Sequence, residues 1–344
     1  MWNKAIYSGA LKDYTYPRDI ECCTLLQFLK QVDTTKRVHL TDVIFDKYPV
    51  AGYDLYIVCC FGEFINEAFI DKLDNDNNLP EVILITSQLF TTTNYKKVKV
   101  FHLEHLHTIR RYFTKEPYLK LASRLNTHGS LSSRSAFHKT FITVKLLQKH
   151  STGYDYTFCD KPTAEYRLDN FANDLNLYYP NIKLTPVEIE TIHYLHNNKK
   201  TVPGGEWDID NDIYRDSKMI WATESIFLSR QHSSLAYLTE KTIKPIVSGT
   251  GFVLVGQQRV YERLDSLGFK SIIDVDFDYS DDTTRFNKLF DLIDNYDFDE
   301  LLNSKQAQEI VDYNYNYFWG AFYSHIEYKN RDRITEILDY INEA

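Results

Sequence analysis

The sequence lacks the cysteine spacings of metal sites and disulfide frameworks, and it lacks long hydrophobic runs. Its five cysteines are Cys22-Cys23, Cys59-Cys60 and the single Cys159, with no Cys-x-x-Cys pair. Zinc sites and disulfide-stapled domains show regular spacings, so we expect reduced thiols and no bound metal. No run approaches the ~20 apolar residues that cross a bilayer, and no signal-peptide pattern begins the sequence. These absences predict a cytoplasmic protein without a membrane segment.

Glycine is scarce, and positive charge is in the minority. The 344 residues include 12 Gly, and 39 Lys and Arg stand against 48 Asp and Glu, a formal net charge of −9. Binding to nucleic acid without sequence preference depends on Lys and Arg that neutralise phosphates, so this balance disfavours it for the whole molecule. The 43% hydrophobic and 25% charged residues are typical of a globular protein, here long enough for two domains.

Short apolar segments alternate with amphipathic ones in the first part of the chain. The pattern predicts strands at 53–60, 81–86 and 97–102 and a helix at 22–32. Strands separated by helices indicate a parallel sheet. We therefore assign residues 1–115 to a Rossmann-like α/β domain.

The same alternation resumes after residue 116. It predicts a strand at 118–125, a polar loop at 130–135 and a helix at 136–149. Further segments of the same kind follow: strands at 219–223, 252–255 and 270–275, and helices at 259–267 and 282–296. Residues 116–304 thus form a second Rossmann-like domain.

Two long helices are predicted at 305–328 and 332–342, within a C-terminal segment 305–344. We expect them to pack back across both domains. The predicted fold class is α/β, with two Rossmann-like domains in a GT-B-like arrangement and C-terminal helices that cross back. In that arrangement the first domain receives the acceptor and the second holds the nucleotide.

The most informative segment lies between two predicted strands of the second domain. Thr239 is the expected N-cap of a helix, and Glu240, Lys241 and Lys244 lie in its first turns. A helix N-terminus offers unpaired N–H groups and the positive end of the helix dipole, so this segment is a candidate seat for a diphosphate. The alternative interpretation is an ordinary helix start with a solvated Glu-Lys surface.

Several stretches around this helix start match a known pattern. Ala222-Thr-Glu-Ser225 and Leu238-Thr-Glu-Lys241, followed by a turn at Gly249, resemble the donor motif of the α-1,3-fucosyltransferases. Together with Val255-Gly256 and Leu267-Gly-Phe269, they are still more similar to glycosyltransferase-like proteins of tailed bacteriophages. The first domain carries no comparable motif.

The resemblance implies a glycosyltransferase of GT-B fold whose donor substrate is a nucleoside diphosphate sugar, such as a UDP- or GDP-sugar, with no metal cofactor. It implies that Glu240 hydrogen-bonds the ribose and that Lys241 and Lys244 lie near the diphosphate. Glu224 and Thr239 belong to the same implied donor site. Cations placed there would stabilise the negative charge that grows on the leaving phosphate.

A basic cluster marks the start of the first helix of the second domain. It contains Arg134, His138 and Lys139, where the phage-type pattern has a His-Arg pair and Lys139 replaces the Arg. These side chains could hold the other side of the diphosphate, or they could form a solvated helix face with one structural histidine. Asp282 and Arg285 match a further part of the pattern, or they form an intrahelical ion pair.

Candidates for a general base follow the predicted strands of the first domain. Glu63 comes directly after the strand at 53–60, and His105 follows the strand at 97–102. If the transfer inverts the sugar carbon, a carboxylate or an imidazole must take the proton of the acceptor hydroxyl. Glu63 and His105 are therefore candidate catalytic residues. The alternative for Glu63 is an ordinary residue at a helix N-terminus.

The leading functional hypothesis is transfer of a sugar from a nucleoside diphosphate sugar to a hydroxyl acceptor. The phage resemblance suggests a 5-hydroxymethylpyrimidine in phage DNA as acceptor, received by a local basic strip that includes Lys96, Lys97 and Lys99. Two alternatives stay open. One is a transferase acting on a surface glycan or a lipid-linked sugar, and the other is a sugar-nucleotide-binding module without turnover.

Overall fold

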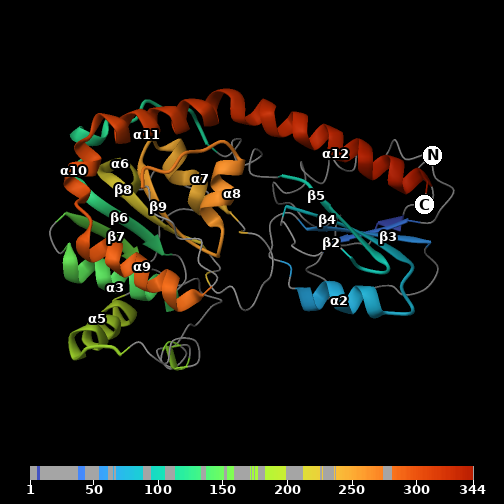
Figure 1. Cartoon of the computed structure of the whole chain (residues 1–344), viewed down its shortest axis with the longest axis horizontal. Helices are drawn as coiled ribbons and strands as arrows, with labels where there is room; N and C mark the ends of the chain where they lie inside the picture. Colours follow the sequence, from blue (N-terminus) through green and yellow to red (C-terminus); the bar gives the residue numbers. More distant parts are fainter. Residues whose placement is uncertain are drawn as a thin grey trace. The chain divides into compact units, whose positions relative to one another are not determined.

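A computed structural model shows two compact units (Figure 1). The first unit comprises residues 1–108, 230–237 and 322–344, and the second comprises residues 109–229 and 238–321. Each unit is described by itself. The residues that the structure describes are 6–7, 38–42, 54–60, 65, 67–87, 94–104, 113–132, 137–150, 153–158, 171, 173, 175–176, 183–198, 212–224, 227, 236, 238–273 and 281–343.

The first unit contains a five-stranded sheet whose neighbouring strands are all parallel, in the order β1-β2-β3-β4-β5. The strands predicted at 53–60, 81–86 and 97–102 are confirmed as β3, β4 and β5, whereas β1 and β2 are additional. The helix predicted at 22–32 lies outside the described residues. The elements are β1 (Ile6–Tyr7), β2 (Val38–Asp42), β3 (Leu55–Cys60), α2 (Glu67–Asn75), β4 (Glu81–Thr86), β5 (Val98–His102) and α12 (Tyr323–Glu343).

The described helices α2 and α12 lie on opposite faces of this sheet (Figure 1). Helix α2 belongs to the crossover from β3 to β4, whereas α12 comes from the end of the sequence and covers the other face. On α12, Asn330 accepts a hydrogen bond from the Glu104 N–H at 3.0 Å and donates to its carbonyl at 2.7 Å. Further along, Tyr340 donates to the Glu81 carboxylate and packs edge-on against Phe101. These contacts hold the helix on the sheet of the first unit.

The second unit contains a four-stranded parallel sheet in the order β7-β6-β8-β9. The strands predicted at 219–223 and 252–255 are confirmed as β8 and β9. The strand predicted at 118–125 is wrong, because the chain there forms a 3-10 turn and the strand begins after it. The strands are β6 (Asn126–Ser132), β7 (Tyr154–Phe158), β8 (Ser217–Thr223) and β9 (Gly251–Val255).

The error concerns β6, whose sequence Asn-Thr-His-Gly-Ser-Leu-Ser is polar although the strand lies inside the sheet. His128 is fully buried, and its Nδ1 accepts a hydrogen bond from the Trp221 indole at 3.3 Å. Gly129 allows close approach to β8, since a Cβ there would lie 2.3 Å from the Ser217 hydroxyl oxygen. These contacts compensate for the missing apolar side chains, and hydrophobic periodicity does not report them.

Helices cover both faces of the second sheet: α3, α5 and α9 lie on one face, and α7, α8 and α11 on the other (Figure 1). The helices predicted at 136–149, 259–267 and 282–296 are confirmed as α3, α8 and α9. The described helices of this unit are α3 (Phe137–Lys149), α5 (Pro186–Asn197), α6 (Asp212–Asp216), α7 (Glu240–Val247), α8 (Val260–Ser266), α9 (Asp282–Asn295), α10 (Phe298–Asn303) and α11 (Lys305–Tyr317), with the 3-10 turn Leu121–Ser123.

Two predictions for the C-terminal part are corrected. The described part of the strand predicted at 270–275 is not a strand, because the Asn314 side chain accepts from the Lys270 N–H at 2.9 Å and donates to its carbonyl at 2.8 Å. The break predicted between 328 and 332 is absent. Helix α11 instead continues through a π-helical turn, Phe318–Phe322, into α12.

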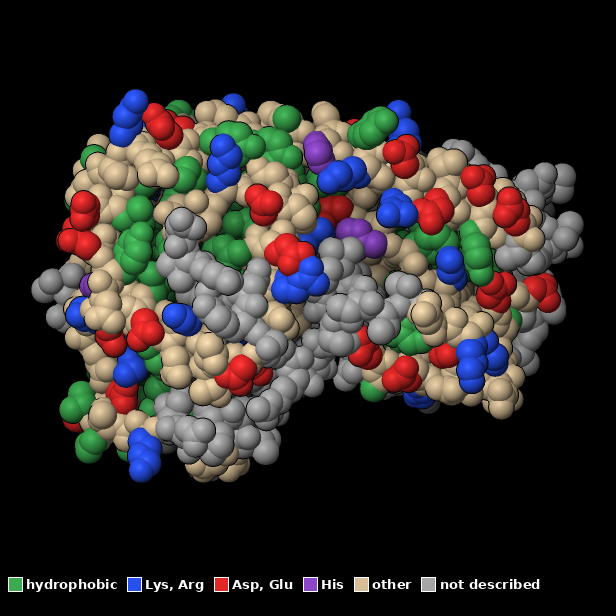
Figure 2. All heavy atoms as spheres, viewed as in Figure 1, with side chains coloured by type: hydrophobic (Ala, Val, Ile, Leu, Met, Phe, Trp, Pro, Cys, Tyr) green, Lys and Arg blue, Asp and Glu red, His purple; other side chains and the backbone are tan. Residues whose placement is uncertain are grey.

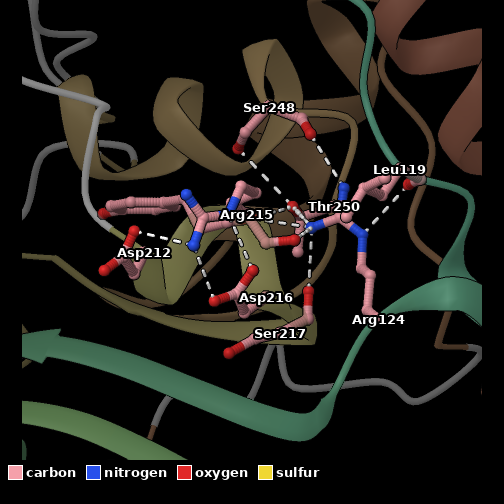
Figure 3. A network of polar contacts seen from close by, with 9 residues as sticks. Leu119, Arg124, Asp212, Arg215, Asp216, Ser217, Ser248 and Thr250 are labelled. Carbon is pink, nitrogen blue, oxygen red and sulfur yellow. Dashed lines mark hydrogen bonds and ion pairs between the residues drawn. The ribbon is translucent and has the colours of Figure 1, made fainter.

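A buried guanidinium joins several elements of the second unit (Figure 3). Arg124 is 5% exposed and donates hydrogen bonds of 2.6 to 3.1 Å. The acceptors are the carbonyls of Leu119, Tyr214, Arg215, Ser217, Ser248 and Gly249 and the hydroxyl of Thr250. Burial lowers the pKa of Arg124 to about 10. The cation lies at the C-terminal end of α7, where the helix dipole is negative.

The same end of α7 closes in a tight glycine turn. The Gly249 N–H donates to the carbonyl of Ile246 at 3.1 Å, and the Thr250 N–H donates to the carbonyl of Pro245 at 2.9 Å. These two hydrogen bonds are the pattern of a Schellman motif. Gly249 has a φ of 60°, and a Cβ there would lie 2.2 Å from the Tyr118 ring. The turn predicted at Gly249 is confirmed, and both its backbone angle and the neighbouring ring require glycine.

We expect Arg124→Met to reduce the free energy of unfolding of the second unit by about 3 kcal/mol or more, because buried carbonyls lose their donors. Arg215→Met is the matched control, since Arg215 is 62% exposed and forms surface ion pairs with Asp212 and Asp216. That substitution should cost much less, because ion pairs at an exposed surface contribute little to stability. Urea unfolding followed by tryptophan fluorescence measures both, and equal losses would contradict the role assigned to Arg124.

Candidate functional site

Charged side chains gather at the carboxyl end of the second sheet. Glu224 follows β8 directly, and its N–H donates to the carbonyl of Val255, the last residue of β9, at 2.8 Å. Helices α3, α7 and α9 begin near this edge, where ligands of parallel α/β sheets bind. We define the edge cluster as His138, Lys139, Glu224, Thr239, Glu240, Lys241, Lys244, Asp282 and Arg285.

The Glu224 carboxylate is 1% exposed and binds the N-terminus of α7. Its Oε1 accepts from the Thr239 N–H at 3.0 Å and from the Thr242 hydroxyl at 2.5 Å. Its Oε2 accepts from the Thr239 hydroxyl at 2.6 Å. A negative charge at the positive end of a helix dipole is favourable, so Glu224 acts as a resident anion for α7.

The remaining N–H groups of the first turn of α7 also have acceptors within the chain. Thr239 is the N-cap, as predicted, and its hydroxyl accepts from the Lys241 N–H at 3.3 Å. The Thr242 N–H donates to the Thr239 carbonyl at 3.1 Å, and the Glu240 N–H hydrogen-bonds its own carboxylate. The N–H groups expected to receive a diphosphate are therefore engaged. An anion here would meet side-chain cations instead.

His138 links α3 to the residue that follows β8. Its Nε2 lies 2.8 Å from the Glu224 carbonyl oxygen, which can only accept, so Nε2 carries the hydrogen. The ring stacks on Phe227 at a centroid distance of 5.6 Å. Burial, and next the charge of Lys139, lower the pKa of His138 to about 3 despite the hydrogen bond to Glu224. His138 is therefore neutral and positions the backbone of Glu224.

Arg285 lies beside the same aromatic ring. It is 2% exposed and forms an ion pair with Asp282 at 2.7 Å, which confirms the intrahelical pair considered for these residues. It also donates to the carbonyl of Phe227, and its guanidinium carbon lies 4.5 Å from the centroid of the Phe227 ring. The ion pair and the ring hold the guanidinium in place within the edge cluster.

Glu240 and Lys241 reach the surface at the mouth of the edge cluster. The Lys241 ammonium lies 2.8 Å from the Glu240 carboxylate, and the two side chains are 15% and 13% exposed. Burial alone would raise the pKa of Glu240, but the charge and hydrogen bond of Lys241 and the charge of Lys244 outweigh it. The pKa falls to about 2, so Glu240 is ionised at neutral pH.

Cationic and anionic side chains lie together in the edge cluster. Among the described residues, the cations are Lys139, Lys241, Lys244 and Arg285, and the carboxylates are Glu224, Glu240 and Asp282. Buried charges are costly unless they are balanced, so these opposite charges support one another. The cluster thus gathers four cations at one sheet edge although the whole chain is acidic.

The structure brings together most of the donor-site residues predicted from the sequence. His138, Lys139, Glu224, Thr239, Glu240, Lys241 and Lys244 all belong to the edge cluster. Phe227 and Thr242 contribute contacts for which the sequence offered no assigned role, although Thr242 stands inside the Thr-Glu-Lys-Thr motif. The candidates Glu63, His105 and Arg134 lie outside the described residues.

One part of the family-like pattern has a structural role away from the edge cluster. In Leu267-Gly-Phe269, Gly268 ends α8 with a φ of 86° and donates to the Asp265 carbonyl at 2.7 Å. A Cβ on Gly268 would lie 2.7 Å from the hydroxyl oxygen of Tyr317 on α11. This glycine therefore serves the packing of α8 against α11.

Comparisons with known proteins do not assign this chain to a family. No family model matches the sequence, and a search of curated proteins finds no match. Across the described helices, none has both the length and the apolar character to cross a membrane. Among all the residues that the structure describes, no group of three or more His, Cys, Asp or Glu side chains is placed to hold a metal ion.

We expect Glu224→Ala to lower the free energy of unfolding by about 3 kcal/mol, because the N-terminus of α7 loses its buried acceptor. Formate should restore part of this loss by entering the space left by the carboxylate, whereas chloride at equal ionic strength should not. Thermal melting in the two salts measures the effect. Glu262→Ala, at an exposed carboxylate paired with Arg259, is the control and should show no preference for formate. A Glu224→Ala variant equally stable in both salts would contradict the resident-anion role.

We expect acid to destabilise the protein partly through His138. Its folded pKa of about 3 lies below the unfolded value of 6.5, so between these pH values the unfolded state binds a proton at this histidine and the folded state does not. This loss begins as the pH falls below 6.5 and continues towards pH 3. In His138→Gln, which keeps an N–H donor for Glu224, stability between pH 6.5 and 4.5 should fall less steeply, by up to about 1.4 kcal/mol per pH unit. Chemical unfolding at each pH measures both slopes, and identical slopes would contradict a buried neutral His138.

Proposed function

We propose that this chain is a glycosyltransferase that binds a nucleoside diphosphate sugar at the edge cluster. The observation that carries the proposal is the gathering of four cations at the carboxyl end of a parallel sheet, with an ionised carboxylate beside the most exposed of them. Two units, each with an all-parallel sheet, are compatible with a GT-B architecture. The Thr-Glu-Lys-Thr resemblance supports the same assignment.

The cluster offers complementary partners for the two polar parts of such a donor. Lys241 and Lys244 supply positive charge for a diphosphate, and the more deeply buried Lys139 and Arg285 add to it. Glu240 is ionised and accepts hydrogen bonds, so vicinal hydroxyl groups of a ribose are suitable donors to it. An anion and hydroxyl groups in one small ligand are the chemistry of a nucleotide.

The same cations would assist the transfer step. When the bond between the sugar carbon and the phosphate oxygen breaks, negative charge grows on the departing β-phosphate. Fixed positive charges in a partly dry site stabilise that charge more than they stabilise the ground state. Lys241 is the cation best placed to contact the phosphate, because it is the one that reaches the surface.

The acceptor half of the reaction depends on the first unit, where Glu63 and His105 lie outside the described residues. Of the basic strip, Lys97 donates to the Asp76 carbonyl at 2.9 Å and Lys99 lies over the Tyr340 ring. Basic and acidic side chains alternate over the described part of the face drawn in Figure 2. The proposal that the acceptor is a hydroxymethylated pyrimidine in DNA therefore rests on the phage resemblance alone. Glycans are the alternative acceptors that an assay must include.

We expect Lys241→Ala to weaken binding of UDP, GDP or their sugars by about 10- to 100-fold, because one charge-assisted contact to phosphate is lost. Isothermal titration calorimetry measures the affinity for each nucleotide. Lys305→Ala removes a lysine that is 91% exposed and should leave the affinity unchanged. If no nucleoside diphosphate binds, or if both variants bind as the unmodified protein does, the donor-site proposal is wrong.

Turnover is tested with the nucleotide sugar that binds. Mass spectrometry of nucleosides and glycans after incubation would show whether sugar reaches DNA with 5-hydroxymethylcytosine or 5-hydroxymethyluracil, unmodified DNA, or a glycan acceptor. Binding without transfer or donor hydrolysis would support a sugar-nucleotide-binding module instead of a transferase.

A further inference from the structure

Glu240 and Lys241, the two side chains of the edge cluster that lie nearest the surface, form an ion pair. The Glu240 carboxylate lies 2.8 Å from the Lys241 ammonium, and that ammonium also lies 3.3 Å from the Thr239 hydroxyl. Neither side chain of the pair is more than 15% exposed, so solvent screens the pair less than it would at an open surface. Any anion that binds Lys241 must therefore compete with a carboxylate that is covalently held next to it.

The competition has different outcomes for different ligands. A bare phosphate or pyrophosphate would take Lys241 and leave Glu240 ionised beside a second negative charge, and like charges in a partly buried site repel strongly. A ligand that also carries vicinal hydroxyl groups can donate hydrogen bonds to Glu240 while its phosphates contact Lys241. Such a ligand replaces both halves of the ion pair.

We propose that the Glu240–Lys241 ion pair is a specificity filter, which rejects bare phosphates and admits phosphate ligands that carry a vicinal diol. The inference rests on the proposed function, because it concerns the same site. It assigns Glu240 a second role: besides contacting the sugar hydroxyls, it blocks inorganic anions that are abundant in cells and would otherwise occupy the cations.

The test compares pyrophosphate with the nucleoside diphosphate that binds most tightly, using calorimetry at constant ionic strength. In Glu240→Gln we expect pyrophosphate to bind about tenfold more tightly, since its competitor has lost its charge. The nucleoside diphosphate should gain less or lose affinity, because an amide is a poorer acceptor for the diol than a carboxylate. The preference for the nucleotide over pyrophosphate should therefore shrink.

Two further variants complete the experiment. Glu262→Gln is the matched control, because it also removes the charge of a carboxylate that is paired with a cation, Arg259. It should leave the preference for the nucleotide over pyrophosphate unchanged. Glu240→Asp keeps the charge with a shorter reach and should give an intermediate preference, and it replaces Glu240→Gln if the latter does not fold.

The outcomes separate this inference from the proposed function. If the unmodified protein binds the nucleoside diphosphate but Glu240→Gln binds pyrophosphate no more tightly, the filter is wrong and the donor site stands. If the unmodified protein binds no nucleoside diphosphate at all, the proposed function is wrong, and with it the filter.

Discussion

Helix α7 is held between two buried charges of opposite sign, and the second unit depends on this arrangement. Glu224 binds its N-terminus and Arg124 binds the carbonyls at its C-terminal end. A helix of eight residues with Pro245 inside it has little stability of its own. Each charge is favourable at its end of the helix dipole, and each also ties α7 to the neighbouring strands. The position of the edge cluster follows from these two contacts.

Backbone and side chains make different contacts at the N-terminus of α7. The backbone N–H groups serve the fold, through Glu224 and Thr239, whereas Glu240 and Lys241, the charged side chains of the same turn, pair with each other nearer the surface. His138 extends the support, because it holds the carbonyl of the residue whose carboxylate holds the helix. Neutral His138 therefore supports the site without adding to its positive charge.

The apolar strands β3, β4, β5, β8 and β9 and helices α3, α8 and α9 could be predicted because their hydrophobic patterns are local, whereas α2, α5, α6 and α10 were not predicted. The N-cap role of Thr239 and the turn at Gly249 were predictable for the same reason, since each follows from residue type at a helix end. Strand β6 was not predictable from periodicity, because His128 pairs with Trp221 and Gly129 lies close to Ser217, both on β8 far along the chain. The role of Arg124 is likewise invisible in the sequence, since its acceptors come from three separated segments. Pairing across long sequence separations is what local patterns do not contain.

The packing of α12 on the first sheet has a consequence for biosynthesis. The ribosome makes the strands of the first unit before the second unit, but Asn330 and Tyr340, which contact Glu104 and Glu81, are made after it. Domains usually fold in the order in which they are made, as they leave the ribosome. Here the second unit, whose residues end at 321, can finish while the first unit still has an uncovered sheet face. Of the two units, the one whose strands are synthesised first is thus the one completed later.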